Sequence, residues 1–133
     1  MKPRHLPLRP FDPHAVWLEA VTDQERKLQK SAIYGCALYR FYDASRSPLY
    51  IGISRNLPDR WNWHRCNTDW QARARYVAVS FYPTRYGAYV AEAAAIRREN
   101  PQFNVMRPKP RRGWRAVDES LYIPPPPQLA DEG

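Results

Sequence analysis

The chain has 133 residues, enough for one compact domain with a modest core but too few for two ordinary domains. It carries 21 Lys and Arg against 13 Asp and Glu, a net charge of +8, and 17 of the 21 basic residues are arginine. Arginine pairs well with phosphate, so this balance favours a polyanionic partner such as nucleic acid, although genome composition also raises arginine content.

The cysteines and the apolar segments indicate where in the cell the protein is expected. Cys36 and Cys66 lack the C-x-x-C spacing of zinc sites and are too few for a disulfide framework. The amino-terminal stretch has no apolar signal core, and no later window approaches a membrane-spanning length. These features predict a reducing, intracellular location in the cytoplasm and no membrane partner.

The first 32 residues are predicted to form an arm and a helix. Four prolines in residues 1 to 13 oppose regular pairing and indicate an extended arm. Asp12 and Pro13 are a helix start signal, and the apolar residues that follow share one face. We therefore expect a helix over about residues 13 to 30 that packs on the domain.

A β-hairpin is predicted next, from IYGCALYRFY through the turn DASRSP to LYIGI. If the turn pairs Phe41 with Tyr50, then Tyr39 faces Gly52 and the two tyrosines share one face. Two phenols would flank a residue without a side chain, where a phosphodiester could approach the backbone. Alternatively, a one-residue slip separates the tyrosines and Gly52 only marks a bulge.

Two helices and a strand follow the hairpin. Ser54 or Asn56 is expected to cap a helix over about 57 to 66, and ARYVAVSFY alternates as a third strand. Thr84 then caps the helix RYGAYVAEAAAIRRE, which Asn100-Pro101 ends. The predicted order is helix, strand, strand, helix, strand, helix.

The carboxyl-terminal stretch from 107 to 133 is predicted to be an arm. It begins with five basic residues among prolines and ends with four consecutive prolines, which favour polyproline II. The tail could recruit a protein partner. The expected boundaries are 1–32, 33–106 and 107–133, and phosphate contacts are expected from Arg107, Lys109, Arg111 and Arg112.

Arg60 and His64 are four residues apart, so both should project from one helix face. An arginine can bind a phosphate through two hydrogen bonds, and a histidine is easily poised as a base near neutral pH. The alternative is a surface arginine beside a histidine that packs on tryptophan. The three nearby tryptophans are expected in the core rather than as base-stacking platforms: Trp61, Trp63 and Trp70.

Glu92 and Asn104 are two further candidates. Glu92 lies among alanines in YVAEAAAI, where a packing helix has little need of a carboxylate, so it indicates a ligand for a divalent metal such as Mg²⁺. A solvated surface glutamate is an equal alternative. Asn104 is consistent with either a turn residue or an amide that ties a loop to the site.

Together these positions resemble the GIY-YIG nuclease family. Its first tripeptide is similar to Ala37-Leu38-Tyr39, and its second stands intact as Tyr50-Ile51-Gly52. The family's remaining motif residues follow in order at Arg60, His64, Glu92 and Asn104. The resemblance covers about residues 33 to 106 and implies a small α/β (α+β) domain with a central three-stranded antiparallel sheet flanked by helices, here with an extra N-terminal helix and Pro-rich tails.

The resemblance also implies roles for these residues. Glu92 would bind one divalent metal, Mg²⁺ or Mn²⁺, while Arg60 steadies the scissile phosphate and Asn104 supports the site. Tyr39, Tyr50 or His64 would orient or deprotonate the attacking water. A phenol with an ordinary pKa near 10 needs help to act as a base at neutral pH.

Two departures from the family pattern bear on the base. Ala37 and Leu38 replace the usual Gly and Ile, which leaves Tyr39 in place and alters packing. Ile53 stands where many relatives carry a lysine, so the weight shifts to His64 or Tyr39. We therefore predict that His64→Ala lowers the rate more than Tyr50→Phe.

The resemblance predicts a metal-dependent endonuclease that hydrolyses DNA phosphodiester bonds. One alternative is a non-catalytic nucleic-acid-binding or scaffold protein of the same fold, with the Pro-rich tail binding a protein partner. A further alternative keeps the chemistry but takes single-stranded DNA or RNA as substrate.

Overall fold

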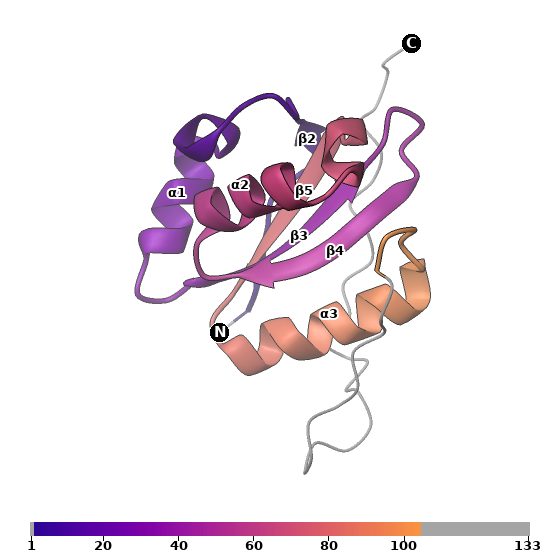
Figure 1. Cartoon of the computed structure of the whole chain (residues 1–133). Coiled ribbons are helices and arrows are strands. Elements are labelled where there is room, and N and C mark those ends of the chain that lie inside the picture. Colours follow the sequence, from indigo (N-terminus) through magenta and orange to yellow (C-terminus); the bar gives the residue numbers. More distant parts are fainter. Residues whose placement is uncertain (1, 105–133) are drawn as a thin grey trace.

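The computed structural model describes residues 2–104, and its centre is an antiparallel sheet (Figure 1). Strand β3 (Cys36–Tyr42) lies between β4 (Pro48–Ser54) and β5 (Tyr76–Tyr82). Two further strands of two residues each, β1 (Arg4–His5) and β2 (Arg9–Pro10), pair with the outer edge of β5. The sheet thus has five strands rather than the three that the family resemblance implied.

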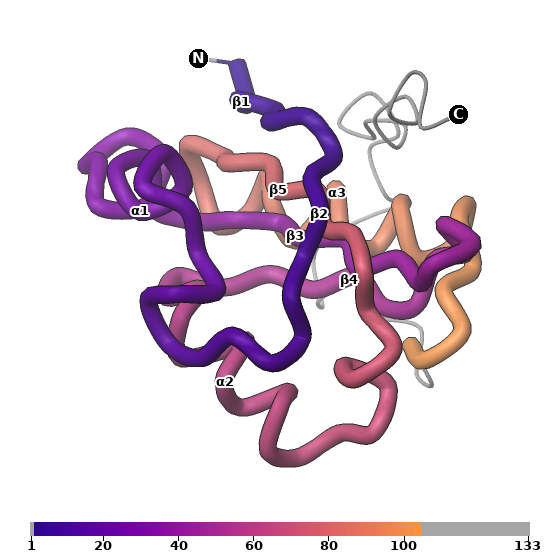
Figure 2. The backbone as a smooth tube through the Cα atoms, turned by 90° about the horizontal axis from the view of Figure 1, so that it is seen from above, coloured from indigo at the N-terminus to yellow at the C-terminus, as the bar shows by residue number. Residues whose placement is uncertain are grey.

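The amino-terminal arm accounts for the extra strands, contrary to the expectation that its prolines prevent pairing. Figure 2 shows the arm running beside β5. Between the prolines, the amide groups of Leu6 and Phe11 donate hydrogen bonds to the carbonyl oxygens of Val79 and Arg75, at 3.0 and 2.8 Å. Prolines are tolerated here because an edge strand needs donors on one side only. The side chains of Leu6 and Phe11 are also buried in the core.

The predicted helix over 13 to 30 is two shorter elements. A 3-10 helix, η1 (Trp17–Ala20), is followed by α1 (Asp23–Lys30). The break lies at Val21, and α1 begins with a capping box in which Thr22 and Glu25 satisfy each other's backbone amides. The sequence carries this signal, Thr-x-x-Glu, but the apolar spacing obscured it.

The remaining helices match their predictions closely. Helix α2 (Leu57–Asn67) is capped by Asn56, which settles the choice between Ser54 and Asn56. Helix α3 (Arg85–Glu99) is capped by Thr84 and ends at Asn100, whose φ of 50° is left-handed. A short 3-10 helix, η2 (Trp70–Arg73), joins α2 to β5.

The helices cover the sheet on both faces. Helix α3 lies against one face, and α2 with the amino-terminal elements lies against the other (Figure 1). The α3 face buries Leu38, Ile51 and the alanines of that helix. The opposite face buries Tyr39, Phe41 and Trp61 among others, and this is the face that carries the aromatic residues of interest.

The hairpin register agrees with the predicted one. Phe41 pairs with Tyr50 and Tyr39 pairs with Gly52, so the two tyrosines lie on one face as diagonal neighbours. The irregularity in the ladder falls between Phe41 and Tyr42 rather than at Gly52. The interpretation of Gly52 as a bulge is therefore wrong.

Two further sequence expectations can be compared with the described residues. Both cysteines lie within them and are free, Cys36 buried and Cys66 exposed. Within residues 2–104, no helix has the length and apolar character needed to cross a membrane.

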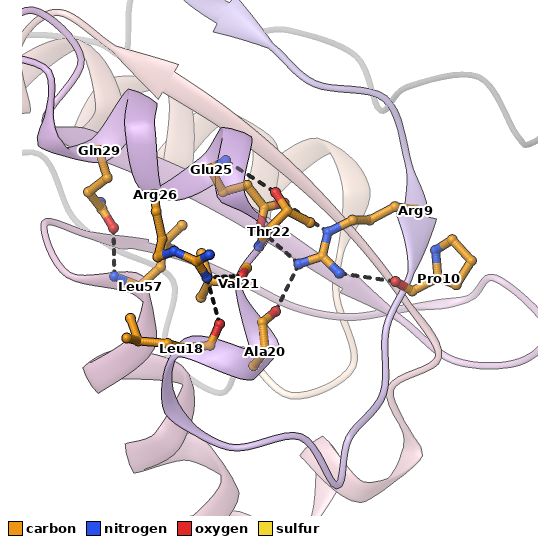
Figure 3. A network of polar contacts seen from close by, with 10 residues as sticks. All are labelled: Arg9, Pro10, Leu18, Ala20, Val21, Thr22, Glu25, Arg26, Gln29 and Leu57. Atoms are coloured by element: carbon orange, nitrogen blue, oxygen red, sulfur yellow. Dashed lines mark hydrogen bonds and ion pairs between the residues drawn. The ribbon is translucent and has the colours of Figure 1, made fainter.

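A polar network fastens the amino-terminal arm to α1 (Figure 3). The Arg9 guanidinium donates from Nε and Nη2 to the two carboxylate oxygens of Glu25, both at 2.8 Å, and from Nη2 to the carbonyl oxygen of Ala20. Glu25 is only 2% exposed and also accepts from the amide of Thr22. Arg9 is thus the only cationic partner that the Glu25 carboxylate has among the described residues.

We expect Arg9→Met to lower the free energy of unfolding by about 2–3 kcal/mol, because it leaves the buried Glu25 carboxylate without a counterion. Urea denaturation of the variant beside wild type measures this loss. Arg4→Met is the matched control, since the Arg4 side chain is exposed and forms no hydrogen bond or ion pair with another described residue. Equal losses in the two variants would contradict a specific contribution from the Arg9–Glu25 pair.

Candidate active site

The two tyrosines of the hairpin close over Gly52. A Cβ at that position would lie 2.5 Å from the hydroxyl oxygen of Tyr39, 2.6 Å from its Cζ and 2.9 Å from Cε2 of Tyr50. Gly52 is itself buried. The space above it is therefore filled by the Tyr39 ring, and it is not bare backbone for a phosphodiester, as the sequence had indicated. Gly52 instead gives the Tyr39 hydroxyl its position.

We expect Gly52→Ala to displace Tyr39 and to lower the free energy of unfolding by about 1–3 kcal/mol, the usual cost of overpacking a core. Thermal unfolding and near-ultraviolet circular dichroism, which reports tyrosine packing, measure both effects. Gly35→Ala is the control, because a Cβ there meets no atom within 4 Å. A Gly52 variant as stable as the Gly35 variant would overturn this explanation.

The Tyr39 hydroxyl is hydrogen-bonded to His64 of α2. The distance from the Tyr39 hydroxyl oxygen to His64 Nε2 is 2.8 Å, and both residues are buried. Desolvation, and secondly the charge of Arg60, lower the pKa of His64 to about 3. His64 is therefore a neutral imidazole at pH 7. Its Nδ1 has no hydrogen-bond partner among the described residues, a costly state for a buried polar atom that is typical of functional sites.

The Tyr39 phenol is held in its protonated form. Burial, and secondly the neighbouring Tyr50, raise the pKa of Tyr39 well above its ordinary value, while the charge of Arg60 opposes this shift. The phenol is protonated and the imidazole is neutral, so in the tautomer that carries its hydrogen on Nδ1 the phenol donates to Nε2. The resting pair is thus an uncharged donor and acceptor aligned for proton movement.

Tyr50 and Arg60 form the partly exposed layer in front of this pair. The Tyr50 ring stacks on Trp70, with centroids 4.8 Å apart, and meets His64 edge to face at 4.9 Å. The Arg60 guanidinium interacts electrostatically with the hydroxyl groups of both Tyr39 and Tyr50. One cation thus acts on both phenols.

A tryptophan supports Arg60 from the next turn of α2. The guanidinium carbon of Arg60 lies 4.7 Å from the Trp63 ring centroid, a cation–π contact. Trp63 is 48% exposed, so its prediction as a core residue is wrong, whereas Trp61 and Trp70 are buried as expected. The residue spacing could not separate Trp61 from Trp63 because α2 is largely polar and has no clear apolar face.

Glu92 brings a carboxylate to the site from α3. It is partly buried, and desolvation raises its pKa to about 7 even though the charge of Arg60 acts to lower it. It forms no hydrogen bond or ion pair with any other residue of the described segment. A poorly solvated carboxylate without a partner is one that a divalent cation would stabilise, so Glu92 fits the role of a metal ligand.

The metal site would contain few protein ligands. Within residues 2–104 there is no group of three or more His, Cys, Asp or Glu residues that could enclose a metal ion. A hard cation such as Mg²⁺ is often bound by one or two carboxylates, with water and substrate phosphate completing its coordination. Glu92 alone is consistent with that mode of binding, and not with a structural metal centre.

Asn104 ties the segment after α3 to the edge of β4. Its side-chain amide accepts a hydrogen bond from the Ile51 amide and donates one to the Ile51 carbonyl oxygen, both at 2.9 Å. Asn104 is thus an amide that fixes the middle of the YIG strand, not a turn residue alone. This contact immobilises the backbone between Tyr50 and Gly52.

The structure gathers most of the predicted site residues and leaves some untested. Tyr39, Tyr50, Arg60 and His64 are mutual neighbours, and Glu92 acts electrostatically on Tyr39. Asn104 acts through the backbone of β4. The basic residues expected to bind phosphate lie outside the described residues: Arg107, Lys109, Arg111 and Arg112.

Gln29 of α1 is a site-positioning residue that sequence reasoning missed. Its side-chain nitrogen donates to the carbonyl oxygens of Gly35 and Ser54 at 3.3 and 3.1 Å, and its oxygen accepts from the Leu57 amide at 2.7 Å. One side chain thus joins the segment before β3, the end of β4 and the start of α2 (Figure 3 shows the bond to Leu57). No local signal marks such a residue, because its partners are distant in sequence.

Residues 35–107 match a protein-family model described as the GIY-YIG catalytic domain. No curated protein and no solved structure gives a significant match. The matched residues contain β3, β4, α2, β5 and α3, and so every residue placed in the site except the supporting Gln29.

Proposed function

Because the chain belongs to the GIY-YIG catalytic-domain family, whose members are nucleases, we propose that it is a divalent-metal-dependent endonuclease that hydrolyses DNA phosphodiester bonds. One observation carries this proposal. The hydrogen-bonded pair of Tyr39 and His64 lies beside a cation, Arg60, and near an unpaired carboxylate, Glu92. A binding protein would have no use for a buried, uncharged proton donor and acceptor next to a poorly solvated carboxylate.

Glu92 would bind the metal ion. A divalent cation supplies positive charge that offsets the charge developing on a phosphate and makes a nearby water more acidic. Poor solvation of the Glu92 carboxylate would favour metal binding, because an anion in a low-dielectric site binds a cation more strongly than a well-solvated anion does. Mg²⁺ and Mn²⁺ both suit a site of oxygen ligands.

Arg60 would bind the scissile phosphate. Its guanidinium can donate two hydrogen bonds to phosphate oxygens, and the stacked Trp63 restricts where the guanidinium can lie. Charge that accumulates on the phosphate in the transition state would meet a cation already in position. Tyr50, partly exposed beside Arg60, is placed to orient the same group or the attacking water.

The pair of Tyr39 and His64 would accept the proton of the attacking water. As the water attacks phosphorus, its proton passes to the phenolic oxygen of Tyr39, and the phenolic proton passes to Nε2 of His64. His64 then becomes an imidazolium, and the Tyr39 phenol is restored. His64 is buried and contacts Tyr39 directly, so it acts through the phenol and not on the water itself.

The proposal is tested by incubating the purified chain with supercoiled plasmid, linear duplex, single-stranded DNA and RNA of the same sequence. Each substrate is given Mg²⁺, Mn²⁺ or EDTA. We expect nicking and linearisation of the duplex with either metal and none with EDTA. Binding without cleavage under every condition would favour a non-catalytic protein, and exclusive cleavage of single strands or RNA would keep the chemistry but change the substrate.

A further inference from the structure

A cavity lies at the end of the sheet where β3 begins and where β4 and β5 end. It has a volume of about 300 Å³. Its lining comes from α1, the α1–β3 segment, the first residue of β3, the residues just after β4 and β5, and the start of α3: Gln29, Ala32, Gly35, Cys36, Arg55, Pro83 and Arg85. Two of these carry charge, and both charges are positive. The cavity is open to solvent on the surface that carries Arg55 and Arg85, which are exposed.

The two arginines of this cavity have no partner in the described chain. The side chains of Arg55 and Arg85 form no hydrogen bond or ion pair with another residue of 2–104, in contrast with Arg9, whose guanidinium is bound by Glu25. Both side chains line the same cavity, and an anion bound there would offset their positive charge. An anion with several oxygens, such as a phosphate, matches their geometry best.

The cavity is close to the metal-binding carboxylate. Arg85 and Glu92 are seven residues apart on α3, so they share a helix face within about 20° and are separated by about 10 Å along its axis. Arg55 follows Gly52 by three residues at the end of β4, again about 10 Å. Burial raises the pKa of the Cys36 thiol between them, and the charges of Arg55, Arg85 and Glu92 all act on that thiol.

We propose that Arg55 and Arg85 form a second phosphate subsite, which binds the backbone of the substrate strand away from the cut. Arg85 lies on the same helix as Glu92, so this phosphate would belong to a nucleotide near the scissile one. The subsite rests on the proposed nuclease function for its position relative to the cut. It requires only nucleic-acid binding for its existence.

The subsite would also restrict how the strand lies on the site. A phosphate held by Arg60 fixes one point of a strand, and a second phosphate held by Arg55 and Arg85 fixes a line. With two points held, the scissile phosphate has fewer orientations relative to the catalytic residues. The second contact would therefore position the strand as well as add affinity.

The test measures binding to a short fluorescein-labelled duplex by anisotropy, in EDTA and over a series of salt concentrations. We expect Arg55→Ala/Arg85→Ala to weaken binding about tenfold to a hundredfold and to reduce the slope of log K against log salt by about 0.9, the value for one phosphate. The matched control is Arg4→Ala/Arg97→Ala, which removes the same amount of charge. Both arginines are exposed, and their side chains have no hydrogen bond or ion pair with another residue of 2–104.

The outcomes separate the subsite from the nuclease proposal. Equal slopes in the double variant and wild type, or equal losses in the double variant and the control, would overturn the subsite, as would a wild-type chain that does not bind the duplex. A loss of slope confined to the double variant, in a chain that cuts no substrate, would uphold the subsite and reject the nuclease. Cleavage by wild type, together with equal salt slopes in wild type and the double variant, would uphold the nuclease and reject the subsite.

Discussion

Replacing Glu92 with glutamine is expected to reduce metal-dependent cleavage at least about a thousandfold, because the loss of the anionic ligand removes several kcal/mol of transition-state stabilisation. Glutamine keeps the size of the side chain and removes the charge. Single-turnover cleavage of a plasmid, at saturating enzyme and several Mg²⁺ concentrations, measures the loss and shows whether added metal restores any activity.

Two comparisons make the Glu92 result specific. Glu19→Gln removes an exposed carboxylate from η1 and should leave the rate unchanged. The Glu92 variant should also unfold at a temperature no lower than wild type, since it replaces a poorly solvated carboxylate without a partner by a neutral amide. Undiminished nicking by Glu92→Gln would remove the basis for a metal at this position.

The second large effect is expected from the pair of Tyr39 and His64. Tyr39→Phe and His64→Ala should each slow cleavage about a hundredfold to ten-thousandfold. The double variant should be no slower than the slower single variant, because both residues act in the same proton-transfer path and either substitution already blocks it. Tyr50→Phe should cost less than His64→Ala, since Tyr50 lies outside that path. Single-turnover rates of wild type, Tyr39→Phe, His64→Ala and the double variant form the double-mutant cycle that tests this.

The pH dependence of the rate provides an independent readout of the same pair. Because burial lowers the pKa of His64 to about 3, the imidazole is neutral from pH 5 upward and cannot produce an inflection near the ordinary value of 6.5. A rate profile with such an inflection that disappears in His64→Ala would show that His64 is solvated in the working enzyme. Independent, multiplicative effects in the double variant would likewise contradict a shared proton path.

Several features of this fold were predictable because their causes are local. The register of the hairpin followed from its turn and from alternation, which put Tyr39 opposite Gly52. The start of α3 followed from the hydroxyl of Thr84. In each case, residues within a few positions of one another determine the outcome, so one sequence contains the necessary information.

The features that were missed depend on contacts between distant segments. The pairing of the arm with β5 joins residues more than sixty positions apart, and no pattern in the arm alone reveals a partner strand. Trp63 is 48% exposed although Trp61, two positions before it, is buried, a difference that depends on the elements around α2. The role of Gly52 depends on the Tyr39 ring, which lies across it. The sequence alone does not show whether a glycine leaves open space or makes room for a neighbouring ring.

The hydrogen bonds of Gln29 affect how such a domain can be transplanted. Residues 35–107 contain the motif residues, yet the side chain that clasps Gly35, Ser54 and Leu57 together lies upstream of that segment. A fusion protein or a recombined gene that starts at the family boundary would leave this clasp behind and loosen the corner from which α2 presents Arg60. Modular reuse of this catalytic unit therefore calls for a cut upstream of α1, or for a new host that supplies an equivalent amide.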